Sequence, residues 1–357
     1  MNIGKVSTNV LKRSVLRQIH TRREEVVNGA GIGVDCAVFS FPGDTVTCVQ
    51  EAALTVSESL LPEQKKYFAE QRTMTQLIRK CVNNLAAKGA EPVAVLITLL
   101  LPDGLEESNL KELMSEAEKA CGSLHIQIAG GQTRITGTVA VPYGVVTGIG
   151  KMPAEVCQDL KPAAPGQDVV ISKWIGLEGT AFLAKQYRKK LLERYPAWLV
   201  EEAAGFDRFL SVIPEAATAV KSGVCGMHDV SRGGIFGALW ELAQRAGVGL
   251  EIDMKKIPVR QETIEICEFF ELNPYELLSG GCLLMAADNG RRLADALTRE
   301  GIPAAVIGRT TSGKDRVVFH DGERRYLDRA KTDQIYMAEN GCKNKSALSG
   351  QIPDKRA

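Results

Sequence analysis

The sequence predicts a mixed α/β (α+β) protein of two domains. Its 357 residues exceed the usual size of one hydrophobic core. Short apolar runs alternate with longer segments in which apolar residues recur every three or four positions, the pattern of strands and amphipathic helices. Pro153, Pro162 and Pro165-Gly166 interrupt both patterns. We therefore expect a first domain over residues 1–155, a second over 156–336 and a flexible tail over 337–357.

The first domain is expected to mix strands with a few helices. A continuous apolar run between Pro92 and Pro102 is typical of a buried strand, and Gly89 suits a helix C-terminus. The expected strands are Val34–Phe39, Thr45–Val49, Val93–Leu101, Leu124–Ala129 and Val139–Ile149. The expected helices are an N-terminal arm within 1–28, residues 63–89 and Glu106–Cys121.

The second domain repeats this alternation. A hairpin is expected over Val317–Arg325, turning at Asp321-Gly322. The expected strands are Gln167–Ser172, Gly249–Asp253, Gly280–Met285 and Ala304–Gly308. The expected helices are Leu177–Ala184, 211–221, the segment after Gly233-Gly234, Glu262–Phe270 and Gly290–Glu300.

The composition excludes several functional classes. With 44 basic and 43 acidic side chains the net charge is +1, so no basic field predicts nucleic-acid binding. No apolar run is long enough to span a bilayer, and no secretory signal opens the chain, which predicts a cytoplasmic protein without a membrane partner. The nine cysteines include no CxxC pair, which favours reduced thiols over a zinc or iron–sulfur site.

A polar cluster followed by a glycine pair is the first candidate site. Residues 228–234 read His-Asp-Val-Ser-Arg-Gly-Gly, and an apolar helical pattern follows. A glycine pair at a helix start leaves backbone N–H groups free for an anion such as phosphate. His228, Asp229 and Arg232 could add proton transfer and a phosphate clamp. The alternative is an ordinary polar loop before a core helix.

Four further segments combine glycines, amides and carboxylates. They are Gly31-Ile-Gly-Val-Asp35, Val49-Gln-Glu51, Asn83-Asn84 and Gly130-Gly-Gln-Thr133. Glycines let backbone amides approach phosphates, and carboxylates hold the accompanying metal, so these segments predict a Mg-nucleotide site. Each segment taken alone could equally be a turn.

The order of these segments resembles a known superfamily. It comprises aminoimidazole ribonucleotide (AIR) synthetase, selenophosphate synthetase, thiamine-monophosphate kinase and the hydrogenase-maturation protein that dehydrates a thiocarboxamide, all with the PurM-like fold. The resemblance covers about residues 4–336 and is strongest to the hydrogenase-maturation branch. The segments that carry it are residues 31–38, 82–92, 129–133, 177–181, 228–234, 280–281, 307–308 and 328–336.

The resemblance implies a fold and an activity. The first domain is expected to pair with a second copy, closing a β-barrel across a homodimer, with ATP in a cleft between domains. The family uses ATP to phosphorylate an oxygen, or a selenium donor, of a small substrate. His228, Asp229 and Arg232 would then be catalytic, and Asp35 and Glu51 would hold Mg²⁺. The residues expected to bind ATP are Gly31, Gly33, Asp35, Asn84, Gly130, Gly131, Gln132 and Thr133.

The chain also departs from the family pattern. Glu51, Asn84 and Gln132 stand where the family usually has aspartates, so two carboxylates have become neutral amides and fewer Mg²⁺ ions are expected. The hydrogenase-maturation enzyme ends in a cysteine that receives a carbamoyl group, whereas the last cysteine here is Cys342. Two functions therefore remain open. One is an ATP-dependent enzyme; the other is a non-catalytic relative that binds nucleotide or a maturation partner.

Overall fold

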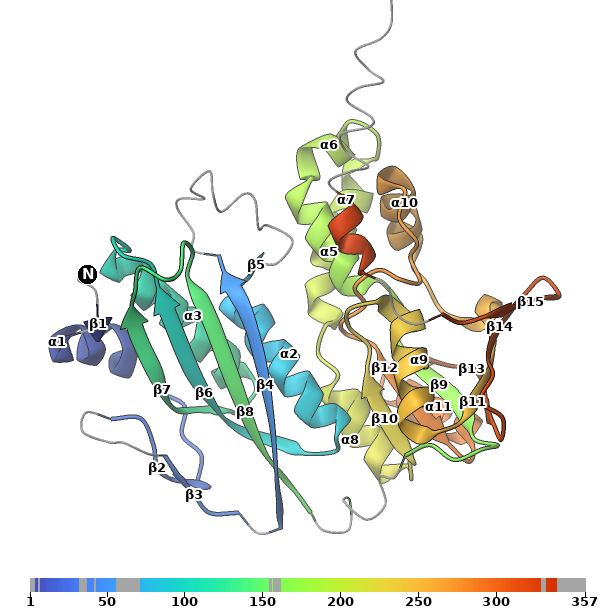
Figure 1. The fold of residues 1–357 in the computed structure, drawn as a ribbon, viewed down its shortest axis with the longest axis horizontal. Helices are drawn as coiled ribbons and strands as arrows, with labels where there is room; N and C mark the ends of the chain where they lie inside the picture. The colour runs from blue at the N-terminus through green and yellow to red at the C-terminus, as the bar shows by residue number, and fades with distance from the viewer. Residues whose placement is uncertain are drawn as a thin grey trace, which may run out of the picture. The chain divides into compact units, whose positions relative to one another are not determined.

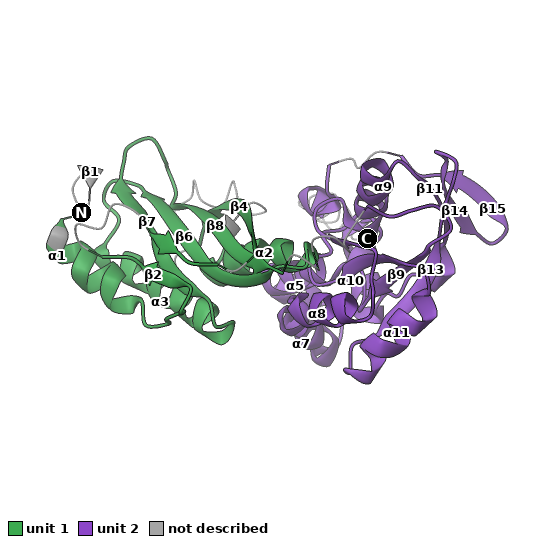
Figure 2. Cartoon of the chain, turned by 90° about the horizontal axis from the view of Figure 1, so that it is seen from below, with its two compact units in different colours: residues 1–158 green, residues 159–357 purple. Residues whose placement is uncertain are grey.

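The computed structural model describes residues 4–5, 7–31, 37–41, 43–55, 71–153, 156, 162–328 and 332–338. The chain divides into unit 1, Met1–Gln158, and unit 2, Asp159–Ala357 (Figure 2). Each unit combines a sheet with helices, which confirms the mixed α/β architecture of two domains. The barrel shared with a second copy stays a prediction. None of the described helices is long and apolar enough to cross a membrane.

Unit 1 is built on a six-stranded sheet (Figure 1). The strand order is β1-β7-β6-β8-β4-β5, with β6 and β7 parallel and β8 antiparallel to both β6 and β4. The strands are β1 (Gly4–Lys5), β4 (Asp44–Leu54), β5 (Gln71–Arg72), β6 (Glu91–Leu101), β7 (Gln127–Ile135) and β8 (Tyr143–Met152). A separate ribbon pairs β2 (Val26–Asn28) with β3 (Val38–Phe39).

Two helices cover one face of this sheet. The first is α2 (Met74–Ala87), which packs on β4, β6 and β8, and the second is α3 (Glu107–Ser123), which packs on α2 and β7 (Figure 1). Thr73 and Gln76 form a capping box that starts α2. The N-terminal arm has three short helical turns, of which the second and third pack on α3. These are α1 (Thr8–Val10), η1 (Leu11–Val15) and η2 (Leu16–Gln18).

Unit 2 holds a seven-stranded sheet in the order β10-β12-β9-β13-β11-β14-β15. Apolar residues of α9 pack on one face of the sheet. On the other face α11 packs on β9, β12 and β13, and α8 packs on α11. The strands are β9 (Asp168–Ser172), β10 (Gly226–Asp229), β11 (Gly249–Asp253), β12 (Leu283–Ala287), β13 (Ala304–Thr311), β14 (Arg316–His320) and β15 (Glu323–Tyr326). The α-helices are α5 (Leu177–Gln186), α6 (Arg188–Leu192), α7 (Ala197–Ala204), α8 (Ile213–Lys221), α9 (Gly234–Ala246), α10 (Gln261–Phe270) and α11 (Gly290–Arg299). The short turns are η4 (Gly205–Phe209), η5 (Met254–Lys256) and η6 (Gln334–Met337).

Several expected loops are strands instead. Glu51 lies within β4, Gly130-Gly131 within β7, and His228-Asp229 at the end of β10. Glycine and polar residues are typical of turns, but here tertiary pairing with neighbouring strands overrides that preference. The expected helix over 63–89 begins only at Met74 in the described residues, and the helical arm ends at Gln18.

One glycine decides how closely β7 can approach β6. The pairing between these strands shifts between Val95 and Leu96, so β7 carries an irregularity at Ala129. Gly131 has φ +143°, and a Cβ there would lie 1.9 Å from the carbonyl oxygen of Ile97. A side chain at this position is therefore incompatible with the pairing, and glycine is required.

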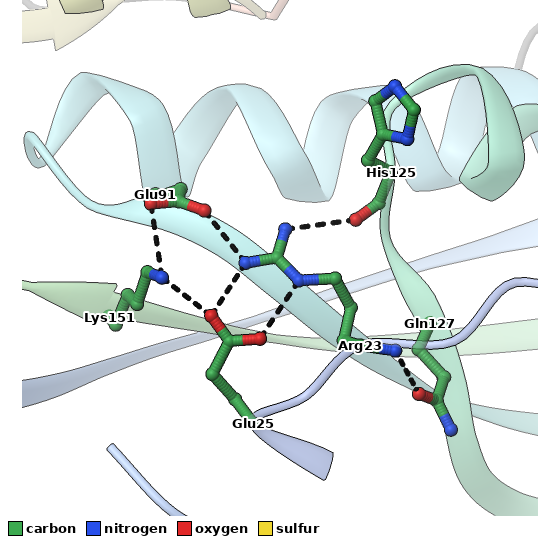
Figure 3. Close-up of polar contacts among 6 residues, drawn as sticks. All are labelled: Arg23, Glu25, Glu91, His125, Gln127 and Lys151. Atoms are coloured by element: carbon green, nitrogen blue, oxygen red, sulfur yellow. Dashed lines mark hydrogen bonds and ion pairs between the residues drawn. The ribbon is translucent and has the colours of Figure 1, made fainter. Parts of the chain in front are cut away.

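A network of charges holds the segment before β2 against the sheet (Figure 3). The Arg23 guanidinium donates to Glu25 at 2.8 and 3.0 Å and to Glu91 at 2.7 Å, and Lys151 Nζ lies 2.5 Å from Glu25 Oε1. The Arg23 amide donates to Gln127 Oε1 at 2.7 Å. The hydrogen bonds that Glu25 accepts hold the pKa of its carboxyl group well below its usual range. The bonds from Arg23 have the largest effect, and the bond from Lys151 adds to it. The network thus joins the N-terminal segment to β6, β7 and β8.

We predict that Gly131→Ala destabilises the protein by about 2–4 kcal/mol, because the new Cβ collides with the β6 backbone at a positive φ. Gly137→Ala is the matched control, since nothing lies within 4 Å of its added Cβ, and it should change stability by less than about 0.5 kcal/mol. Urea unfolding followed by circular dichroism measures both. Equal stabilities of the two variants would contradict the packing described for Gly131.

We predict that the Arg23–Glu25–Lys151 network makes stability depend on acid. Because the pKa of Glu25 is lower in the folded chain than in the unfolded chain, its contribution is complete above about pH 4.5 and is lost as the pH falls below that value. Glu25→Gln should therefore show a flatter decline of the urea midpoint between about pH 5 and pH 3. Glu300→Gln, at an exposed position at the end of α11, should keep the wild-type slope. Parallel profiles for wild type and Glu25→Gln would refute the assignment.

Candidate functional site

Two glycine segments far apart in the sequence line one pocket of unit 1. The pocket has a volume of about 400 Å³, within the range of small-molecule sites. Gly29–Gly31, after β2, form one side, and Gly130–Thr133 of β7 form another. The arm and the β2–β3 ribbon complete the wall with Leu16, Ile19 and Phe39. The structure therefore brings Gly31 together with Gly130, Gly131, Gln132 and Thr133, as the sequence predicts.

The pocket combines bare backbone with apolar walls. None of its described lining residues is charged. An anion bound here would depend on backbone N–H groups, the Gln132 amide and the Thr133 hydroxyl. The apolar walls suit the planar ring of a ligand. The Arg23 network positions this site, because Gln127 contacts both Arg23 and the space beside Gly29.

The predicted metal ligands are spread over the sheet. Glu51 pairs with Val145 on β8, Val145 with Thr98 on β6, and Thr98 with Gln132 on β7. Glu51 and Gln132 therefore share one row and one face, separated by three strand spacings of about 4.8 Å each. Gly33 and Asp35 lie outside the described residues.

Asn84 lies on the other side of β4. Cys48 of β4 faces α2, and Glu51, three positions along the same strand, points to the opposite face. Asn84 belongs to α2 and is half-buried. The chain thus carries Glu51 and Asn84 on opposite sides of the strand. Among the described residues no group of three or more His, Cys, Asp or Glu side chains could hold a metal ion.

This donor set does not by itself form a metal centre. Mg²⁺ requires near-octahedral oxygen ligands and is usually held by one or two carboxylates together with phosphates and waters. Glu51 offers one exposed carboxylate, and Gln132 offers only a neutral oxygen. Any Mg²⁺ here would need phosphate oxygens of a ligand and a carboxylate outside the described residues, such as Asp35.

In unit 2 the three predicted catalytic residues do not face one another. His228 and Asp229 are successive residues of β10, so their side chains project from opposite faces. His228 Nε2 lies 2.9 Å from Glu241 Oε2 of α9, whereas Asp229 is buried on the other face. Arg232 is exposed in the turn before α9.

The glycine pair at the start of α9 already has partners. The Gly233 N–H donates to Asp333 Oδ2 at 2.7 Å, and the Gly234 N–H donates to the Ser231 carbonyl at 3.2 Å. The expectation that these two amides are free for phosphate is therefore wrong. Asp333 also accepts from the Leu278 and Ile335 amides, and burial raises the pKa of its carboxyl group. The chain supplies its own anion at this helix N-terminus.

Sequence reasoning missed the residues that support these sites. Asp333 is a single acid with no local pattern, and its only signal is that it lies in the 328–336 segment that carries part of the resemblance. A buried ion pair of Lys173 and Glu215 was also missed; Lys173 Nζ donates to the carbonyls of Phe209 and Ser211 as well. No sequence spacing links Arg23 to Glu91, because only the folded sheet brings them together.

Comparison with known proteins places both units in one family. The N-terminal domain model of the AIR synthase related proteins matches residues 33–152, and the C-terminal domain model matches residues 164–321. Carbamoyl dehydratase HypE of Rhodobacter capsulatus is 27% identical over 263 residues, which cover 71% of this chain and 75% of the relative. The protein of the same name from Rhizobium leguminosarum bv. viciae is 25% identical over 315 residues, 85% of each chain.

Solved structures share the fold. HypE in complex with ATP superposes with a TM-score of 0.73 at 21% identity, over 93% of this chain and 97% of the other. Thiamine-monophosphate kinase of Stenotrophomonas maltophilia K279a gives 0.62 at 20% identity, over 90% and 98%. The two domain models are matched in order along the chain, each over one of its units, and the chain belongs to the AIR synthase related family.

Proposed function

We propose that this protein binds ATP in the glycine pocket of unit 1 and transfers the terminal phosphate to an amide-type or other oxygen of a small substrate. The observation that carries the proposal is the convergence of Gly29–Gly31 and Gly130–Thr133 on one pocket of suitable volume. A family structure with the same fold was solved in complex with ATP, and another with AMPPCP, which supports this choice of ligand.

The proposed chemistry needs few groups from the protein. A substrate oxygen attacks the terminal phosphorus and ADP leaves. An amide oxygen is a poor leaving group, and its phosphorylation makes it a good one. Backbone amides at Gly31 and Gly130-Gly131 would stabilise charge on the phosphates. Arg232 and His228 of unit 2, which are at least partly exposed, are proposed to bind substrate, whereas Asp229 is buried on the opposite face of β10.

Mg²⁺ would neutralise phosphate charge if bound, with Glu51 and Asp35 as the proposed ligands. The described residues alone do not complete that site, so no step of the proposal depends on the ion. We propose a homodimer on the basis of the family resemblance. A barrel shared with a second copy would add residues to the face of the sheet that carries Glu51.

A second function is favoured by the neutral amides. Asn84 and Gln132 contribute no negative charge, and no charged side chain is among the described residues of the pocket. A chain of this kind could bind nucleotide without turnover and serve as a binding partner in maturation. A family structure solved as a HypE–HypF complex makes a protein partner reasonable.

We predict that ATP binds the purified protein and that Gly130→Val weakens binding at least tenfold, because the new side chain enters the pocket beside Leu96. Gly137→Val, outside the pocket, is the control. Isothermal titration with and without Mg²⁺ measures affinity, and ADP release measures turnover. Binding that needs Mg²⁺ and yields ADP supports the enzyme; metal-independent binding without ADP supports the non-catalytic alternative. Equal affinities of wild type and Gly130→Val would refute the pocket.

We predict that Gln132→Asp increases the dependence of ATP binding on Mg²⁺, since it returns a carboxylate to the pocket wall, and that Asn84→Asp, on the opposite side of β4 from Glu51, does not. Asn109→Asp, which adds the same charge on α3, should leave it unchanged. ADP release that appears only in Gln132→Asp would mean that the natural chain has lost turnover. An unchanged Mg²⁺ dependence of Gln132→Asp would contradict a role for this position in metal binding.

A further inference from the structure

Two cysteines of unit 1 lie in contact behind the sheet. Cys48 of β4 and Cys81 of α2 are 33 positions apart, and their Sγ atoms are 3.4 Å from each other. Cys48 Sγ also donates to the Cys81 carbonyl at 3.1 Å. Gly148 of β8 leaves the space for them, because a Cβ there would lie 2.7 Å from Cys81 Sγ. The nucleotide proposal uses neither thiol.

The two thiols differ in exposure and acidity. Cys48 is half-buried, whereas Cys81 is fully buried. The hydrogen bond with Cys81 lowers the pKa of Cys48, and the same contact, with burial, raises the pKa of Cys81. A half-buried thiol with a lowered pKa, in contact with a fully buried thiol, is the arrangement of an attacking and a resolving cysteine.

The other described cysteines lack this arrangement. Cys121, Cys267 and Cys282 are fully buried, and burial raises the pKa of each thiol. Cys225 is half-buried like Cys48, but burial raises its pKa. Cys225 therefore serves as a control, because it is exposed to a similar degree as Cys48 but lacks the contact with a second thiol.

We propose that Cys48 and Cys81 form a reversible disulfide, with Cys48 as the residue that reacts first with a low-molecular-weight disulfide such as oxidised glutathione. The two sulfur atoms must approach from 3.4 Å to about 2.05 Å for the bond to form. The proposal does not depend on nucleotide binding.

The reaction balances in two exchanges. The Cys48 thiolate attacks one sulfur of oxidised glutathione, forming a mixed disulfide and releasing one glutathione thiolate. Cys81 Sγ attacks Cys48 Sγ and its proton passes to the departing glutathione thiolate, which forms the protein disulfide and releases the second glutathione as a thiol. The two cysteines are oxidised by two electrons, and the glutathione disulfide is reduced by two. Excess reduced glutathione reverses both steps.

The disulfide would join β4 to α2 covalently. A cross-link between distant residues restricts the unfolded chain, so the oxidised protein should unfold at a higher temperature than the reduced protein. It would also hold α2 and β4 together one helical turn before Asn84 and three residues before Glu51.

Peptide mapping tests the proposal on the full-length chain. The folded protein is incubated with oxidised glutathione, quenched in acid, alkylated and digested with trypsin. Cys81 then lies in peptide 81–88 and Cys48 in peptide 24–65, which also contains Cys36. We expect the two peptides linked, about 2 Da below their summed mass, with fragmentation assigning the bond to Cys48. Loss of the link in reduced glutathione should accompany a fall in melting temperature.

Variants separate the two exchanges. Cys81→Ala should stop at the mixed disulfide, with glutathione retained on Cys48, whereas Cys225→Ala should form the link as the wild type does. If Cys81→Ala does not fold, Cys48→Ala tests the same point, because Cys81 should then stay unmodified. The proposal is overturned if the folded wild type yields no linked peptide, if the bond runs through Cys36, or if Cys81 is glutathionylated in Cys48→Ala.

Discussion

The close approach of β7 to β6 at Gly131 is the constraint on which the candidate site depends. The Ile97 carbonyl occupies the space where any side chain would begin, so the pairing of the two strands exists only with glycine at this position. The same backbone path exposes Gly131 and Gln132 at the edge of a pocket whose opposite side comes from Gly29–Gly31. Strand pairing and ligand access therefore have one physical cause.

Charge is distributed unevenly between this pocket and its surroundings. The Arg23 network is dense, yet it holds the N-terminal segment in place and contributes nothing to the described pocket wall. The wall offers backbone groups, an amide and a hydroxyl. An anion held here, as proposed, would depend on directed hydrogen bonds, and neutralisation of its charge would be left to groups outside the described wall. The neutral amide of Gln132 therefore bears on the choice between an enzyme and a binding protein.

Unit 2 illustrates how a sequence motif can be satisfied internally. The glycine pair before α9 has the backbone conformation of an anion site, but Asp333 already fills that role from the far end of the described chain. His228 likewise has a partner on the adjacent helix, Glu241. Both contacts use groups that lie close in space and far apart in sequence. The proposed substrate-binding role of this segment thus rests on Arg232 and the exposed part of His228.

Periodicity and ordered motifs are local properties, so they suffice to predict the two-domain α/β class, most strands and helices, and the family. The β6 strand and the β14–β15 hairpin match their predicted positions for this reason. Tertiary structure alone decided that Gly130-Gly131 lie in a strand, that Glu51 and Asn84 lie on opposite sides of β4, and that Asp333 caps α9. These outcomes depend on which segments pair across the sheet, and no local pattern of residues records that pairing.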